Sequence, residues 1–275
     1  MSTALTERPV TGAGPVTGAG PAARAGPVTC VDGAVLLDPA RPLHLAHAGP
    51  GLTIATVSID WLRDQPSGRL AGIVSRHLSP GEREHAAALR LPKRRVEWLA
   101  GRLAAKHAVR VHRRRRLGIT GPTRDISVDA VPEGPRAGKP RVNAPVEIAI
   151  SHSAGFAVAA CGCRPVGIDV ERHREISPVL ARRISSVDRP AAAGPHDRLP
   201  LMPPPLRWTC KEAVLKYFGF GLRVDVREVR LTGWRPDGGF TWSPGPALRS
   251  AAAASPWPGH GWAREIGGYA LALVW

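Results

Sequence analysis

The sequence predicts an α+β fold, in which short strands alternate with helices. Apolar residues recur at near-helical spacing after Pro92 and again around Trp208, which favours two packed helices. Short runs rich in Val, Ile and Ala, bounded by Gly and Pro, lie between and after them, as is typical of strands. With 275 residues, the chain is long enough for one large domain or two small ones.

Residues 1–50 are expected to form a flexible tail. Small units of Thr, Gly, Ala and Pro repeat there, and scarcely any large apolar side chain is available to offset the entropy cost of ordering. The one apolar patch, at residues 31–38, suits a short strand or a docking segment. Folded sequence is predicted to begin with a strand near Leu52.

A first helix is predicted to begin at Ser79. Ser79 and Glu82 have the spacing of a capping box, and Pro80 suits a first helical turn. The helix should extend to about residue 90, where the pattern ends.

A second, longer helix is predicted at residues 93–112. It places Arg102 and Lys106 on one face, where basic side chains are most often simply solvated. The four arginines at 113–116 are expected to carry the charge into a loop, where such runs are hydrated or bind polyanions.

Two polar turns interrupt the strands that follow. Lys139 lies in a Gly-Lys-Pro turn, from which its side chain can reach outward. Ser151 and His152 lie at the polar corner between two apolar stretches, as expected where two strands are joined.

A strand predicted at residues 165–171 carries two carboxylates. Asp169 and Glu171 share one face, because side chains alternate along a strand. Adjacent carboxylates repel, which is tolerable if both are solvated or if both hold a divalent cation such as Mg²⁺. The sequence of this strand, taken alone, favours the alternative in which both carboxylates are solvated.

The stretch around which the chain is organised is residues 207–222. Glu212 and Lys216 lie one helical turn apart in an otherwise apolar helix, so they face the same way and can hold a metal ion and a phosphate side by side. The same residues also fit a capping box beginning at Thr209, in which Glu212 only secures the first turn. Taken alone, the capping alternative is favoured. The other elements predicted in this half are a short helix at 178–184, strands at 224–234, 240–243 and 269–275, and a surface loop at 247–258.

Composition narrows the class of protein. A formal net charge of +16 favours an anionic partner: nucleic acid, a phosphorylated small molecule or an acidic protein surface. Four irregularly spaced cysteines suit neither a disulfide framework nor a zinc site, so reduced thiols in a cytoplasmic protein are expected. No apolar run is long enough to cross a bilayer, and no membrane partner is expected.

Two motifs together resemble a known family. GIDVE at 167–171 and WTCKEAVLK at 208–216 are similar to the paired signature of the 4′-phosphopantetheinyl transferases, specifically the larger single-chain type that serves polyketide and nonribosomal peptide synthesis. Their joint occurrence is far more specific than either half. Upstream segments are also similar, in the family's order: LSPGEREHA, WLAGRLAAKHA, GKPRV and ISHSAGFAVAA.

The resemblance implies a fold and an activity. The fold would consist of two similar α/β lobes, residues 51–164 and 165–275, each a small antiparallel sheet packed on a long helix, with the active site at their junction. The activity would be transfer of the phosphopantetheine arm of coenzyme A to a serine of an acyl or peptidyl carrier protein, releasing adenosine 3′,5′-bisphosphate. A monomer that docks an acidic carrier protein is expected.

The resemblance also implies roles for individual residues. Glu212 and Lys216 would be catalytic, and Asp169, Glu171 and Glu212 would bind Mg²⁺. Lys211 is a weaker candidate for contact with the carrier or a phosphate. Residues expected to bind coenzyme A are Lys139, Ser151, His152, Asp169, Lys216, Arg102 and Lys106. Glu82 and His85 depart from the family, whose members often carry basic residues in this helix.

Other function classes remain open. A nucleic-acid-binding protein, suggested by the charge, would show steep salt dependence and no need for Asp169 or Glu212, but the sequence has no recognisable binding module. A degenerate homologue would bind coenzyme A without turnover. A Ser/His hydrolase built on SHSAG is excluded, because the glycine that a nucleophile elbow needs before its serine is missing.

Overall fold

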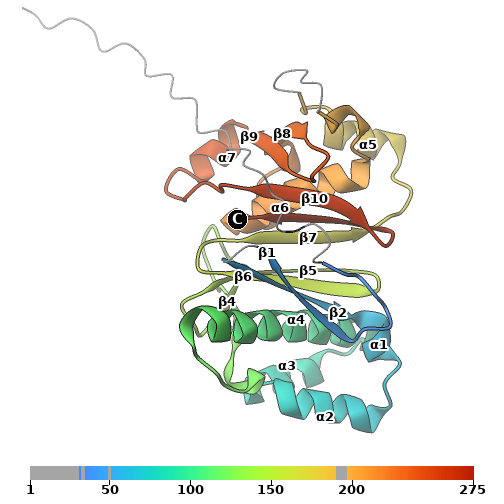
Figure 1. The fold of residues 1–275 in the computed structure, drawn as a ribbon, viewed down its shortest axis with the longest axis vertical. Helices are drawn as coiled ribbons and strands as arrows, with labels where there is room; N and C mark the ends of the chain where they lie inside the picture. The colour runs from blue at the N-terminus through green and yellow to red at the C-terminus, as the bar shows by residue number, and fades with distance from the viewer. Residues whose placement is uncertain (1–30, 32–34, 49–50, 190–196) are drawn as a thin grey trace, which may run out of the picture.

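Two antiparallel sheets lie face to face at the centre of the protein (Figure 1). The computed structural model describes residues 31, 35–48, 51–189 and 197–275. Helix α4 (Pro92–Leu117) covers the outer face of one sheet, and helix α6 (Pro204–Phe218) covers the outer face of the other. A buried apolar core fills the space between the sheets, and a further core lies under each helix. The predicted α+β fold with two similar lobes is therefore confirmed.

The first sheet has the strand order β1-β2-β6-β5. Its strands are β1 (Leu43–Ala48), β2 (Leu52–Ser58), β6 (Phe156–Gly162) and β5 (Glu147–Ser153). Every residue of the central strands β2 and β6 is buried, because α4 covers one face and the second sheet covers the other. This double burial explains their small and β-branched composition.

The second sheet has the strand order β10-β11-β7. Its strands are β10 (Gly261–Ile266), β11 (Tyr269–Val274) and β7 (Gly167–Arg172). The chain passes from the first sheet to the second in the short connection between β6 and β7. Every residue of β11 is buried between α6 and the first sheet.

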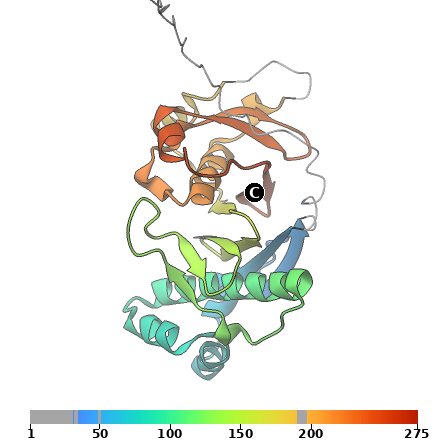
Figure 2. The same ribbon diagram turned by 90° about the vertical axis from the view of Figure 1, so that its left-hand side faces the viewer.

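Smaller elements surround the two sheets. Helices α1 (Ile59–Arg63), α2 (Ser67–His77) and α3 (Pro80–Ala88) lie beside α4. The hairpin of β3 (Val128–Ala130) and β4 (Pro140–Val142) reaches toward the second lobe (Figure 2), where Arg223 donates to the Ala137 carbonyl at 2.6 Å. The second lobe adds α5 (Pro178–Ser185), β8 (Val229–Trp234), β9 (Phe240–Pro244) and α7 (Pro246–Ala251).

Several expected boundaries are wrong. Residues 43–48 of the expected tail form β1, which pairs with β2, and the patch at residues 31–38 contributes the buried side chains of Val35 and Leu37. The arginines at 113–116 continue α4 and do not form a loop, because the helix ends at Leu117 with Gly118 as its left-handed cap. Strand β10 was not predicted, nor was α7 within the expected surface loop. The expectation for residues 1–30 and 32–34 lies outside the described residues.

Each long helix buries one lysine in an ion pair. Lys106 of α4 is 0% exposed, lies 2.5 Å from a Glu82 carboxylate oxygen and donates to the Ile126 carbonyl at 2.6 Å. Lys211 of α6 is also 0% exposed, and it donates at 2.7 Å to both Asp188 and the Val229 carbonyl. Lys106 therefore secures α4 to α3 and to the turn before β3, and Lys211 secures α6 to the start of β8. The solvated face suggested by the sequence is wrong for Lys106.

The predicted capping box of α3 is confirmed. Ser79 Oγ accepts a hydrogen bond from the Glu82 amide at 3.4 Å, and Glu82 Oε2 accepts from the Ser79 amide at 2.9 Å. We expect Ser79→Ala to lower the free energy of unfolding by about 1 kcal/mol, because a helix-terminal amide loses its partner. Urea unfolding measures this change. Ser75→Ala on the exposed side of α2 is the control, and an equal effect there would contradict the assigned role of the cap.

None of the described helices is both long and apolar enough to cross a bilayer.

Candidate active site

Strand β7 and helix α6 bring Asp169 and Lys216 into contact. Lys216 Nζ lies 2.6 Å from Asp169 Oδ1, and Ser151 of β5 bridges the pair, donating to Asp169 Oδ1 at 2.7 Å and accepting from Lys216 Nζ at 2.9 Å. Asp169 is only 3% exposed. The alternative in which the carboxylates of this strand are simply solvated is therefore wrong for Asp169, whose burial is balanced by the lysine.

Glu212 does not cap a helix. Pro203 is the N-cap of α6, so Thr209 lies within the helix and donates its hydroxyl to the Pro205 carbonyl at 2.8 Å. The capping alternative is wrong, because proline is well tolerated at the first helical position and the N-cap lies six residues before Thr209, nearly two turns earlier. Glu212 is 8% exposed, and its Oε1 atom is buried without a hydrogen-bond partner.

The environment of Glu212 changes its acidity. Burial raises its pKa to about 7, and the negative charges of Asp169 and Glu171 act in the same direction, while the Lys216 ammonium opposes them. Glu171 is half-buried, and its pKa is raised mainly by burial, although a hydrogen bond from Ser153 Oγ at 2.8 Å lowers it. The three carboxylates thus influence one another, and a cation among them would relieve the repulsion.

Two carboxylate oxygens of this cluster have no hydrogen-bond partner. Asp169 Oδ2 and Glu212 Oε1 are both buried and have no hydrogen-bond partner, so two carboxylate oxygens are available to a cation. Glu171 instead has one oxygen engaged by Ser153. In the described part of the chain, no group of three or more His, Cys, Asp or Glu side chains is arranged to hold a metal ion. Two of the three expected ligands therefore have free oxygens, and the third is turned to a serine.

A cleft between the lobes opens beside this cluster. It consists of two adjoining cavities, of about 380 and 490 Å³, which share Gly138, Pro140 and Ile150 as lining residues. The smaller cavity is lined by Lys216 of α6 and by Lys139 of the hairpin turn. The larger cavity is lined by the first half of α4 together with His152 at the end of β5. Both lobes thus contribute to one cofactor-sized cleft.

The larger cavity has a basic and aromatic wall. Arg94, Trp98 and Arg102 follow one another at four-residue intervals along α4, and the Arg102 guanidinium lies 4.8 Å from the centre of the Trp98 ring. Burial lowers the pKa of Arg102, and its Nε atom has no partner. Arg94 was missed from the sequence, although the spacing from Arg94 to Arg102 could have revealed a shared helix face.

The expected ligand residues therefore fall into two groups. Lys139, His152, Arg102 and Lys216 line the cleft, although Lys139 also lies 2.5 Å from Glu147. Lys106 does not line it, because its ammonium is used within the protein, and the same is true of Lys211. Ser151 is 7% exposed, and its hydroxyl is occupied by Asp169 and Lys216.

The second lobe matches a known protein family. Residues 165–274 match the 4′-phosphopantetheinyl transferase superfamily. The superfamily match covers β7 and α6, and therefore Asp169, Glu171, Glu212 and Lys216. No curated protein matches the chain.

Solved structures similar to this chain include three synthases. One is a holo-(acyl-carrier-protein) synthase from Bacillus anthracis in complex with coenzyme A (3′,5′-ADP), 28% identical over 40% of this chain and 92% of that chain, with a TM-score of 0.32. The Helicobacter pylori holo-[acyl-carrier-protein] synthase with coenzyme A is 22% identical over 41% and 96% of the two chains, with a TM-score of 0.31. The holo-ACP-synthase of Plasmodium yoelii is 15% identical over 44% and 95%, with a TM-score of 0.33.

Proposed function

We propose that the protein transfers the 4′-phosphopantetheine arm of coenzyme A to a serine of an acyl or peptidyl carrier protein. The observation that carries this proposal is the meeting of Asp169, Glu212 and Lys216 beside a cleft lined by cationic side chains. The superfamily match of the segment that holds these residues supports it.

The reaction requires a base and a cationic group. The serine oxygen bonds to the phosphorus that bears the pantetheine arm, and the bond from that phosphorus to adenosine 3′,5′-bisphosphate breaks. Glu212 would accept the serine proton, directly or through water, and in the metal-free protein its pKa is raised to about 7. Lys216 would offset the negative charge that builds on the departing bisphosphate.

Mg²⁺ is the cation that we propose for the carboxylate cluster. Asp169 Oδ2 and Glu212 Oε1 would be its ligands, and Glu171 would join them if its side chain turned away from Ser153. When bound, the ion would neutralise negative charge on the pyrophosphate group of the substrate.

The cleft is proposed to hold the nucleotide part of coenzyme A. Lys139, Arg102 and His152 would contact phosphate groups, and Arg94 joins this set because it lines the same cavity. Ser151 would have a positioning role, since it already orients Asp169 and Lys216. Lys106 is not proposed as a ligand of coenzyme A, because its ammonium group forms a buried ion pair with Glu82.

The partner is proposed to be a carrier protein with an acidic surface. A formal net charge of +16 would accelerate its encounter, and binding should weaken as salt screens the charges. We also propose the larger single-chain subfamily of polyketide and nonribosomal peptide synthesis, acting as a cytoplasmic monomer. Separate lobes, each with its own sheet and helix, support a site completed within one chain.

The proposal is tested by incubating the protein with coenzyme A, Mg²⁺ and a panel of small carrier proteins. We expect the intact mass of at least one carrier to rise by one phosphopantetheine group, and a carrier with its acceptor serine changed to alanine to stay unmodified. Coenzyme A binding without any mass change would indicate the degenerate homologue. Salt-sensitive nucleic-acid binding that Asp169→Asn leaves intact, with no transfer, would indicate the nucleic-acid-binding class.

A further inference from the structure

A second cluster of chemically active side chains lies near the other end of α4. His112 of α4 contacts Thr53 of β2 through Nδ1, with the hydroxyl at 3.3 Å, and Cys163 through Nε2, with the sulfur at 3.4 Å. His112 is 1% exposed and Thr53 is 0% exposed, whereas Cys163 is exposed. None of these three is among the described residues that line the interlobe cleft.

The surroundings of His112 determine the protonation of its imidazole ring. Burial is the main cause that lowers the pKa of His112, and the positive charges of Arg116 and Arg115 lower it further. The ring is therefore neutral near pH 7 and has one nitrogen that donates and one that accepts. When Nδ1–H donates to the Thr53 hydroxyl, Nε2 is the acceptor that faces the Cys163 thiol. In this tautomer, a buried base adjoins an exposed nucleophile.

The other described cysteines differ from Cys163. Cys161 and Cys210 are both 0% exposed, and burial raises the pKa of each thiol well above its ordinary value. A thiol of that kind is inert, because neither its thiolate nor a reagent is available. Among the described cysteines, only Cys163 combines access to solvent with a neighbouring base.

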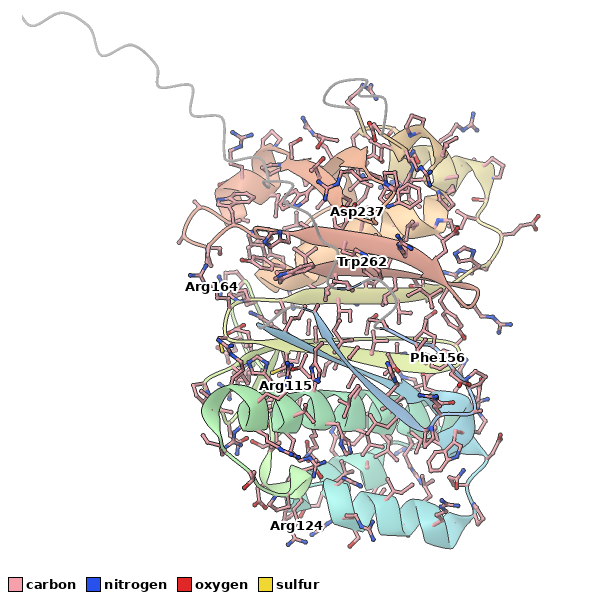
Figure 3. The ribbon with its side chains drawn as sticks, in the orientation of Figure 1. Arg115, Arg124, Phe156, Arg164, Asp237 and Trp262 are labelled. Atoms are coloured by element: carbon pink, nitrogen blue, oxygen red, sulfur yellow. The ribbon has the colours of Figure 1, made fainter. Side chains whose placement is uncertain are left out.

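Cationic side chains lie near the pair formed by Cys163 and His112. Arg115 and Arg116 act electrostatically on His112, and Arg164 follows Cys163 directly in the chain. Figure 3 labels Arg115 of α4 and Arg164 of the connection between β6 and β7, both in the left half of the view. No carboxylate in the described part of the chain forms an ion pair with Arg115, Arg116 or Arg164. Their charge is therefore available to an anionic reagent.

We propose that Cys163 is a site of thiol–disulfide exchange that prefers small anionic disulfides. Its sulfur attacks one sulfur of the incoming disulfide, whose sulfur–sulfur bond breaks as the new bond to Cys163 forms. The thiol proton passes to His112 Nε2 and then to the departing thiolate. The incoming disulfide is the oxidant, so the products are one mixed disulfide on Cys163 and one free thiol.

Three disulfides of different charge test the proposal on the full chain. Oxidised glutathione is anionic, hydroxyethyl disulfide is neutral and cystamine is cationic. At pH 7 we expect glutathione to be added to the peptide that contains Cys163, as seen by intact mass and peptide mapping, and Cys163→Ser to abolish that adduct. An adduct found only on Cys30, or a Cys163 rate equal to that of the urea-unfolded chain, would overturn the proposal.

Surface variants separate charge from base catalysis without disturbing the core. The double variant Arg115→Gln, Arg116→Gln should lower the ratio of the rate with oxidised glutathione to the rate with hydroxyethyl disulfide by roughly three- to tenfold, because any change in the base His112 affects both rates alike. Arg110→Gln is the matched control, because Arg110 lies on the same helix but acts on His77 and His107. Equal losses in both variants would contradict the anionic preference.

His112→Asn tests the base itself. It should slow exchange with all three disulfides by roughly tenfold or more, because the thiol loses its proton acceptor. Thermal unfolding checks that the variant is folded. If it is not, Thr53→Val, which keeps the shape of the side chain but removes the hydroxyl, is used in its place. Unchanged exchange rates in a folded His112 or Thr53 variant would overturn the role of the base. The result does not depend on the proposed transferase activity.

Discussion

Glu212→Gln is expected to reduce phosphopantetheine transfer by at least about a hundredfold while leaving the fold intact. The amide keeps the size of the side chain but can neither accept the serine proton nor offer a charged oxygen to a cation. Intact-mass kinetics on a carrier protein measure the loss. Asp169→Asn should have a comparable effect, because Lys216 and Ser151 both bind this carboxylate.

The same variant should change stability in a direction that depends on pH. The pKa of Glu212 is about 7 in the folded protein, above its ordinary value of 4.5, so the folded state binds the proton more tightly than the unfolded state. The stability that this group supplies is complete below about pH 4.5 and is lost as the pH rises through 7. In metal-free buffer, Glu212→Gln should therefore gain stability relative to the wild type between pH 5 and 8, by roughly 3 kcal/mol at most.

The control for this prediction is Glu265→Gln. Glu265 is exposed on β10 and pairs with His173 at 2.9 Å, so transfer should be unaffected and the gain in stability at high pH should be absent. Wild-type turnover by a folded Glu212→Gln variant would contradict the assigned role of Glu212 as the base. A loss of activity accompanied by unfolding would contradict the expected gain in stability.

Structural features that depend only on residues close together in the chain were predictable from the sequence. The capping box of α3 depends on residues three apart, and the spacing of Glu212 and Lys216 defines a shared helix face without any tertiary contact. Alternation along β7 similarly identified Asp169 as facing away from the buried Ile168 and Val170. These features are determined within one helical turn or one short strand.

Features that depend on distant partners were not predictable. Lys106 seemed to belong to a solvated stripe, because its carboxylate partner, Glu82, lies on another helix. The sequence nevertheless contains one indication that Lys106 is buried. RLAAKHAV at 102–109 and RWTCKEAV at 207–214 share the same Arg, Lys and Ala-Val positions, and their lysines occupy equivalent buried ion pairs in the two lobes. The repeat could have suggested that both lysines are structural.

Among the glycines that the structure describes, Gly167 is the one whose change to alanine is expected to have the largest effect. Gly167 begins β7, and a Cβ atom placed there would lie 1.9 Å from the Ala213 carbonyl oxygen and 2.7 Å from the Tyr217 amide nitrogen of α6. Both atoms belong to helix backbone, so the clash cannot be relieved by a side-chain rotation. The variant should lose about 3 kcal/mol of stability or more, because α6 must move away from the sheet.

The same displacement should damage the active site. Gly167 lies two residues before Asp169, and the α6 backbone that it touches lies next to Glu212 and Lys216. A shift of about 1 Å between β7 and α6 should lower transfer by roughly a hundredfold even at temperatures where the variant is folded.

A pair of other glycines provides the control for Gly167→Ala. A Cβ atom added at Gly68 or Gly72 of α2 would meet no heavy atom within 4 Å, so alanine should raise stability there by about 0.5–1 kcal/mol through its greater helix propensity. Thermal and urea unfolding distinguish these opposite signs. If Gly167→Ala kept the stability and activity of the wild type, the close packing of α6 on β7 would be wrong. The proximity of Asp169 and Glu212, on which the proposed chemistry depends, would then lose its structural basis.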